Sequence, residues 1–335
     1  MKIYYGRAVY NQKEINAVIR VLKKKSLTLI DGSSVKELEH KLSKLFGKKF
    51  GIMVNSGSSA NLLALSSFNF KKGSEIITPT LTFSTTIAPI YQLGLVPHFI
   101  DVGESSFVSR IDQIEKCINK KTVAIMIPNL LGNVPYWPAI HKIAKKHKLK
   151  IIEDSADTLG AKIDNKPTGI YSDVSITSFY GSHIISCAGN GGMFLTNDKK
   201  LYEKAKVLRS WGRMSTLIED SENIYKRLSI KLNGYDYDKK FVFSEVGYNF
   251  EPSEIGASFG LIQLKKFKLF NKIRNQNFKS HCEYFRKKNE FFIVPKLNKN
   301  VKTNFLAYPI IIKKNKYFNR KKLQIFLEKN KIQTR

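Results

Sequence analysis

The sequence has few cysteines, few acidic residues and no long apolar run. Its three cysteines, Cys117, Cys187 and Cys282, lie far apart and form no Cys-x-x-Cys pair. We therefore expect neither a disulfide framework nor a zinc or iron–sulfur site. No apolar stretch approaches the roughly 18 residues that a membrane-spanning helix needs, and the first residues lack the apolar core of a signal peptide. These absences predict a cytoplasmic protein without a membrane span.

The shortage of acidic residues leaves a large positive charge, because 57 Lys and Arg face 27 Asp and Glu, for a formal net charge of +30. Such a charge suits a nucleic-acid partner, since neutralising phosphates drives that binding. The lysines, however, occur as short scattered pairs such as Lys145-Lys146 and Lys265-Lys266, without an arginine-rich arm or an aromatic platform. We therefore expect solvated helix faces that steer a small anionic substrate, and no nucleic-acid partner.

Apolar residues are plentiful and regularly spaced. With 335 residues and 42% hydrophobic content the chain can bury a large core, so we expect one large domain and a smaller one. Two amphipathic helices are predicted at residues 14–25 and 34–46, the second with Ser34 as its N-cap. From Phe50 onward short apolar runs alternate with helical stretches, which predicts a largely parallel sheet with helices on its faces.

Ligands of such sheets bind beyond the carboxyl ends of the strands, so the loops that follow strands are the candidate sites. After GIMVN, Ser58 and Ser59 open a helix, which suits a phosphate seat or an ordinary serine-capped helix. After EIITP, Phe83 either stacks on a planar ligand or belongs to the core. Asp154 ends the apolar run KIIED and either meets a cation, such as a protonated ring nitrogen, or caps the following segment.

A fourth loop runs from Ser178 to Gly192 and is rich in small residues, with His183 as its titratable side chain. Glycine and serine let backbone N–H groups approach an anion, so this loop suits a bound ligand. The alternative is a tight turn with an incidental histidine.

Six motifs occur in one order along the chain: SGSSAN, TFSTT, EDSADTLGA, SFYGSH, RSWGR and GYNFEPSEIGASFGLIQL. In this order the chain resembles, over essentially its whole length, the pyridoxal-phosphate nucleotide-sugar aminotransferases called the DegT/DnrJ/EryC1/StrS family. The resemblance implies the α/β architecture of fold type I, with a mostly parallel mixed sheet flanked by helices. It implies a large cofactor domain at residues 1–245, a smaller C-terminal domain at residues 246–335, and a homodimer with shared active sites.

The resemblance also assigns each marked side chain a part of the cofactor. Phe83 would stack on the pyridine ring, and Asp154 would pair with the ring nitrogen, which keeps the nitrogen protonated and makes the ring an electron sink. Asp157 falls near the ring hydroxyl, where these aminotransferases usually carry glutamine. The cofactor phosphate would be held by Ser58, Ser59 and Ser178 and, from the neighbouring subunit, by Asn249.

His183 stands where the family carries the lysine that binds pyridoxal phosphate covalently, and neither Ser182 nor Ile184 can replace that lysine. With a histidine at this position the chain resembles the 3-dehydratases of 3,6-dideoxyhexose biosynthesis, which hold pyridoxamine phosphate without a covalent bond. The resemblance implies loss of the C3 hydroxyl from a nucleotide-linked 4-keto-6-deoxyhexose destined for surface polysaccharide. His183 would remove a proton from the cofactor and then protonate the departing hydroxide.

Three departures from the family pattern bear on the rest of the reaction. Residues 214–240 contain no cysteine, so we expect a 3-dehydratase without an iron–sulfur cluster, which uses glutamate to regenerate the cofactor. The RSWGR motif itself is closer to the sequence of the cluster-bearing 3-dehydratases. The loop behind His183 reads AGNGG, from Ala188 to Gly192, one residue longer than usual. The chain stops at Arg335, where family members continue, so we expect a small domain that is incomplete relative to the family.

Two other functions fit the same residues. An aminotransferase or isomerase-like relative could work on bound pyridoxamine phosphate without a lysine, and the altered AGNGG loop leaves this open. A degenerate member that only binds cofactor or sugar nucleotide, or serves as a dimer partner, would fit the early end of the chain.

Overall fold

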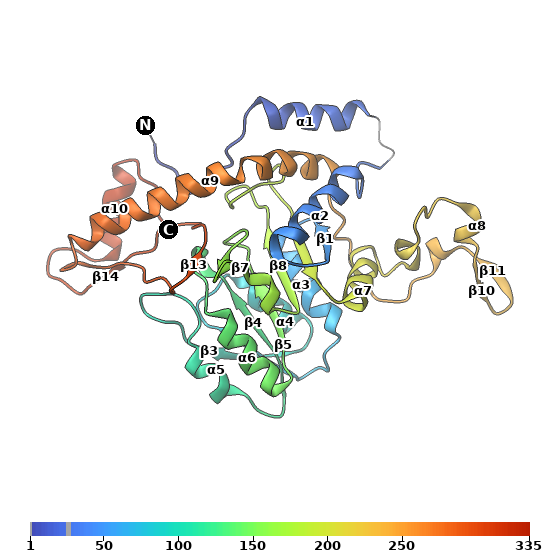
Figure 1. The fold of residues 1–335 in the computed structure, drawn as a ribbon, viewed down its shortest axis with the longest axis horizontal. Helices are drawn as coiled ribbons and strands as arrows, with labels where there is room; N and C mark the ends of the chain where they lie inside the picture. Colours follow the sequence, from blue (N-terminus) through green and yellow to red (C-terminus); the bar gives the residue numbers. More distant parts are fainter. Residues whose placement is uncertain (1, 25–27) are drawn as a thin grey trace.

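A seven-stranded sheet lies at the centre of the computed structural model, which describes residues 2–24 and 28–335 (Figure 1). The strand order is β1-β9-β8-β5-β4-β2-β3. Strand β9 is antiparallel to both neighbours, and the other pairs are parallel, as the alternation in the sequence predicts. The strands are β1 (Phe50–Val54), β2 (Glu75–Pro79), β3 (Val96–Ile100), β4 (Thr122–Pro128), β5 (Lys150–Asp154), β8 (Val174–Ser178) and β9 (Gly192–Thr196).

Helices cover both faces of this sheet, because alternate side chains of each strand enter two different apolar layers. Ile152 packs in one layer with Leu63 of α3 and Leu208 of α7. Ile151 packs in the other layer with Trp137 of α6, and α2 and α9 cover the rest of that face. The helices are α1 (Gln12–Lys23), α2 (Ser33–Phe46), α3 (Gly57–Phe68), α4 (Ser84–Gln92), α5 (Ile111–Cys117), α6 (Trp137–His147), α7 (Lys199–Arg209), α8 (Ile224–Arg227), α9 (Glu254–Arg286) and α10 (Arg320–Lys329).

Both N-terminal helices occur close to the predicted ranges, but the predicted N-cap is wrong. Helix α1 ends at Lys23, and Lys25 lies outside the described residues. Helix α2 begins one residue before Ser34, with Gly32 at the N-cap and no side-chain cap. Its free N–H groups are satisfied from α9, because Glu254 accepts from Ser34 N at 2.7 Å and from Val35 N at 3.1 Å. A carboxylate at this end of a helix also opposes the positive end of the helix dipole.

Helix α9 is 33 residues long and runs across the upper part of the molecule in Figure 1, below α1 and above the sheet. Beyond α9 the chain forms short strands and α10, and Ile332 pairs in parallel with Ile3, so the two chain ends lie side by side. The predicted division at residue 245 stays a prediction. The remaining strands are β6 (Lys162–Ile163), β7 (Lys166–Pro167), β10 (Ile230–Leu232), β11 (Tyr235–Tyr237), β12 (Phe292–Ile293), β13 (Val301–Lys302) and β14 (Ile311–Ile312).

No helix within the described ranges combines the length and the apolar character that a bilayer span requires.

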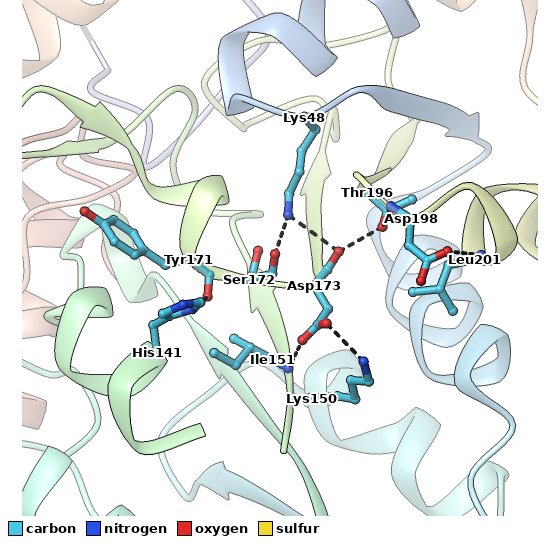
Figure 2. Close-up of polar contacts among 10 residues, drawn as sticks. All are labelled: Lys48, His141, Lys150, Ile151, Tyr171, Ser172, Asp173, Thr196, Asp198 and Leu201. Atoms are coloured by element: carbon cyan, nitrogen blue, oxygen red, sulfur yellow. Dashed lines mark hydrogen bonds and ion pairs between the residues drawn. The ribbon is translucent and has the colours of Figure 1, made fainter. Parts of the chain in front are cut away.

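The amino ends of the parallel strands meet in a polar cluster around Asp173, the residue before β8 (Figure 2). The Asp173 carboxylate accepts from Ile151 N at 2.8 Å and from Lys150 Nζ at 3.3 Å. Its carbonyl accepts from Thr196 Oγ1 at 2.9 Å, and Lys48 Nζ donates to the neighbouring carbonyl of Ser172. Burial lowers the pKa of Lys48 to about 8. We call this group the amino-end cluster.

Candidate active site

The predicted site residues gather at the opposite edge of the sheet, where the parallel strands end. Ser58 and Ser59 follow β1, Phe83 follows β2, and Asp154 is the last residue of β5. Ser178 is the last residue of β8. The carboxyl ends of neighbouring parallel strands share one edge, so these side chains, far apart in sequence, face the same space. We call this group the carboxyl-end site.

The phosphate seat predicted from SGSSAN is the N-terminus of α3. Ser56 is the N-cap and accepts from Ser59 N at 3.0 Å, while the Ser59 hydroxyl donates to Asn55 Oδ1 at 2.6 Å. Gly57 lies against Ser178, because a Cβ built at residue 57 would lie 2.6 Å from Ser178 Cβ. The helix end and the end of β8 thus form one cradle, which suits an anion through its free N–H groups and dipole. Ser58 is exposed on this cradle.

Asp154 is a buried carboxylate whose partners are all neutral. Its Oδ2 accepts from Asn61 Nδ2 and from Thr86 Oγ1, each at 2.8 Å, and its Oδ1 accepts from Ala156 N at 3.0 Å. Burial raises the pKa of Asp154 above its ordinary value, and the three donors lower it only in part. A cation beside this carboxylate would favour its charged form.

Phe83 stands at the N-cap position of α4 with its side chain 69% exposed. The alternative that this ring belongs to the core is therefore wrong. Thr86, in the first turn of the same helix, holds Asp154, so one helix end places both the ring and a partner of the carboxylate. An exposed aromatic ring at this edge is available to stack on a planar ligand.

Asp157 lies in the loop after β5 and accepts from Leu131 N at 2.8 Å. Burial is the main cause that raises the pKa of Asp157 to about 6, and the charge of Asp154 adds to it. The pKa of Tyr5, in the N-terminal segment, is raised by burial and by the charge of Asp157.

His183 lies in the loop between β8 and β9 and lines a cavity of about 490 Å³, together with the N-terminal segment, α9 and residues 305–308. Its ring packs edge-on against Tyr180, with centroids 5.8 Å apart, and its buried Nδ1 has no hydrogen-bond partner within the described ranges. Burial lowers the pKa of His183 to about 4, the Ser178 backbone opposes this shift, and the nearby Arg274 cation adds to it. The histidine is therefore neutral at neutral pH and able to take a proton.

Asn249 lies beside the same cradle through its backbone. Its carbonyl accepts from Asn55 Nδ2 at 3.3 Å, and residue 249 pairs with Ser210 in an isolated antiparallel bridge. The Asn249 residue itself is exposed. The backbone of Asn249 is thus fixed while its side chain remains available, which is compatible with the predicted contact to a neighbouring subunit.

The residues present fit pyridoxal phosphate or pyridoxamine phosphate. The donor set contains an anion cradle, an exposed aromatic ring and a buried carboxylate that has no cationic partner among the described residues. Buried polar atoms at this edge also lack partners within the described part of the chain, namely Asn61 Oδ1, Thr78 Oγ1 and His183 Nδ1. Such atoms are costly unless something else satisfies them. The role of each residue toward the cofactor stays a prediction.

Two groups of residues in this site carry no sequence prediction of their own. Asn61 and Thr86 stand three residues after Ser58 and Phe83, within the motifs SGSSAN and TFSTT, and helical spacing alone would place them on the same faces. Arg274, in contrast, comes from α9 and has no local signal that connects it with His183.

Comparison with known proteins gives consistent matches over the chain. A family model described as the DegT/DnrJ/EryC1/StrS aminotransferase family matches residues 9–335. The dTDP-4-dehydro-2,6-dideoxy-D-glucose 3-dehydratase of Saccharopolyspora spinosa is 34% identical over 320 residues, which are 92% of this chain and 69% of that enzyme.

Solved structures agree with these matches. The E. coli GDP-4-keto-6-deoxy-D-mannose-3-dehydratase with bound hydrated PLP has a TM-score of 0.88 at 30% identity, and the match covers 100% of this chain and 85% of that one. A GDP-4-keto-6-deoxymannose-3-dehydratase with a trapped PLP-glutamate geminal diamine has a TM-score of 0.85 at 28% identity, with coverage of 98% and 84%.

Proposed function

We propose that this chain, which belongs to the DegT/DnrJ/EryC1/StrS aminotransferase family, removes the C3 hydroxyl from a nucleotide-linked 4-keto-6-deoxyhexose with a non-covalently held pyridoxal or pyridoxamine phosphate. The observation that carries the proposal is His183, a neutral histidine in the loop where the family has its covalent lysine, whose Nδ1 has no hydrogen-bond partner among the residues that the structure describes. A histidine can move a proton there but cannot anchor the cofactor.

The chain's own residues would hold the cofactor by three separate contacts. The α3 N-terminus with Ser58, Ser59 and Ser178 would bind its phosphate, Phe83 would stack on its ring, and Asp154 would pair with its ring nitrogen. When bound, the cofactor supplies an amine for the C4 ketone and a ring that withdraws electrons. These non-covalent contacts are more important when no covalent bond fixes the orientation of the cofactor.

His183 would carry the proton transfers. Its neutral ring takes a proton, and the resulting imidazolium returns a proton to the oxygen that leaves C3. The cavity beside His183 is lined mostly by side chains of the N-terminal segment, α9 and residues 305–308, and would leave room for the substrate next to that ring. Asp157 would face the ring hydroxyl of the cofactor.

The proposal extends to the reaction partners. Glutamate is the amino donor we propose, in line with the glutamate adduct that one solved relative contains. We also propose a homodimer in which Asn249 reaches the phosphate seat of the neighbouring subunit. The nucleotide is left open, because the relatives named above act on dTDP- and GDP-linked sugars.

The direct test is incubation of the protein with pyridoxal phosphate, glutamate and GDP-, CDP- or dTDP-linked 4-keto-6-deoxyhexoses, followed by mass spectrometry of the sugar nucleotide. Loss of the C3 oxygen supports the proposal. Gain of an amine with the oxygen retained would show an aminotransferase, and an unchanged sugar with bound cofactor would show a degenerate member; either result overturns the proposal.

Borohydride provides a second, independent test of the missing covalent bond. We expect treatment of the cofactor-loaded protein with borohydride to leave no cofactor attached to the peptide that contains residues 179–192. Covalent label in that peptide would contradict the non-covalent mode of binding.

A further inference from the structure

Arg274 of α9 lies on the wall of the His183 cavity and donates its guanidinium hydrogens to three backbone carbonyls. Nη1 donates to Phe305 O at 2.8 Å and to Leu306 O at 3.1 Å. Nη2 approaches His183 O at 3.5 Å. One side chain thus joins the backbone of the catalytic loop to a segment more than 100 residues further along the chain.

No carboxylate within the described residues forms an ion pair with the half-buried Arg274. Burial lowers the pKa of Arg274 from its ordinary value, and the charge of Arg274 in turn lowers the pKa of His183. The other titratable or charged groups that face the cavity or the His183 ring are Tyr4, Tyr5, Arg7, Tyr180, His281 and Tyr308. None of these side chains is acidic, so nothing in this set offsets the positive field.

The segment that Arg274 holds is itself tied to the other wall of the site. Leu306 N donates to Leu131 O at 3.1 Å, and Leu131 N donates to Asp157 at 2.8 Å. Asn304 is almost fully buried and bonds both the N–H and the carbonyl of Leu159. Arg274 therefore links the backbone of His183 to a segment that is fixed to the loop carrying Asp157.

We propose that Arg274 is a positioning residue for His183: its guanidinium fixes the loop backbone against residues 305–306 and places a cation on the wall of the cavity that His183 lines. The catalytic consequence rests on the function proposed above, whereas the positioning itself is a property of the protein without substrate. Arg274 would touch no reacting atom and would act on the reaction through His183 alone.

The test uses three variants of the full chain: Arg274→Gln, which removes the charge, Arg274→Lys, which keeps the charge but loses the planar fork, and Arg286→Gln as the control. Arg286 is exposed on the same helix, so its variant reports the effect of losing one charge from α9. Circular dichroism and thermal unfolding establish that each variant is folded.

The first measurement is an NMR pH titration of the six histidine rings in the protein without cofactor, with His183→Asn to assign the resonance. We expect Arg274→Gln to raise the pKa of His183 by at least about half a unit, because a nearby cation is removed. Arg274→Lys should keep most of the low pKa but shift the His183 backbone amide resonance, since the fork to three carbonyls is lost. Arg286→Gln should change neither.

The second measurement is steady-state kinetics of dehydration over a range of pH. We expect Arg274→Gln to lower kcat about tenfold with KM of the sugar nucleotide little changed, and to move the acidic limb of the pH profile upward with the NMR titration. An unaltered His183 titration and amide shift in both Arg274 variants would overturn the proposal. If no sugar is dehydrated by any variant, the proposed function fails, and the NMR measurement still decides the positioning role.

Discussion

At the amino-end cluster Asp173 accepts from a backbone N–H and from Lys150 (Figure 2). At the carboxyl-end site the donors to Asp154 within residues 2–24 and 28–335 are all neutral. The same difference extends to their surroundings. None of the buried polar atoms that lack a partner in the described ranges belongs to the amino-end cluster, while Asn61, Thr78 and His183 each contribute one at the carboxyl edge. Each edge carries an aspartate at or next to the end of a strand, Asp173 at one and Asp154 at the other, and the amino-end cluster also contains Lys48 and Lys150.

The two edges differ in whether their polar groups have complete hydrogen-bond and charge partners. A polar group whose partners are complete stabilises the fold and has nothing left to offer a ligand. A buried group that lacks a partner or a counter-charge costs free energy, which the bound ligand can recover. On this criterion we expect the amino-end cluster to be structural and the carboxyl-end site to bind the ligand.

The largest expected effect comes from replacing His183, the proposed proton carrier. We expect His183→Asn to lower the rate of dehydration by about 10²- to 10⁴-fold, because the loss of a general acid–base costs that much. Cofactor binding should persist, since the phosphate cradle, Phe83 and Asp154 are unchanged. Absorbance of bound cofactor and product analysis by mass spectrometry measure the two properties. Retained dehydration would remove His183 from the proton transfers.

The sharpest test of the comparison makes the same substitution at both edges. We expect Asp154→Asn to weaken cofactor binding by about 10- to 100-fold, because a charged hydrogen bond to the ring nitrogen is lost. Asp173→Asn should leave cofactor binding unchanged and lower the free energy of unfolding by about 1 kcal/mol, because it weakens the contacts to Ile151 and Lys150. Absorbance titration and urea unfolding provide the two readouts.

The opposite pattern, with cofactor affinity lost at Asp173 and kept at Asp154, would break the comparison between the two edges. Equal losses at both edges would show that the two clusters act together.

A further expected effect is on stability as a function of pH. The folded protein holds the pKa of His183 at about 4, below the ordinary value of 6.5. The unfolded chain therefore binds a proton first as the pH falls, so the contribution of His183 to stability is complete above pH 6.5 and is lost toward pH 4. Relative to His183→Asn, we expect the free energy of unfolding to fall by about 2 kcal/mol between pH 8 and pH 5.

Urea unfolding of both proteins at the two pH values measures this difference, and the exposed His40→Asn is the matched control. Asp157 should act with the opposite sign. Its pKa in the folded protein is about 6, against an ordinary 3.8, so its contribution to stability is complete below pH 3.8 and is lost as the pH rises through 6. A flat pH dependence in the His183 comparison would contradict the buried, neutral state of that ring.

Much of this architecture could be predicted from the sequence. The alternation of apolar runs and helices from Phe50 onward correctly predicts the mostly parallel sheet, and the motif order correctly predicts the family and its fold. The predicted position of Asp154 at the end of a strand is confirmed, and the core alternative for Phe83 is wrong. These features follow from local periodicity and from the rule that ligands bind where parallel strands end.

The identity of the groups at the site was thus determined by the sequence alone: the serines of the cradle, the ring, the carboxylate, and a histidine where a lysine would anchor the cofactor. Only the tertiary structure decided which of these groups have hydrogen-bond or charge partners. Glu254 replaces Ser34 as the cap of α2, and Arg274 approaches His183 across 91 residues of sequence. The periodicity of apolar residues encodes which face of a helix or strand is buried. The hydrogen-bond partners and the electrostatic surroundings of a single side chain depend on how distant segments pack together.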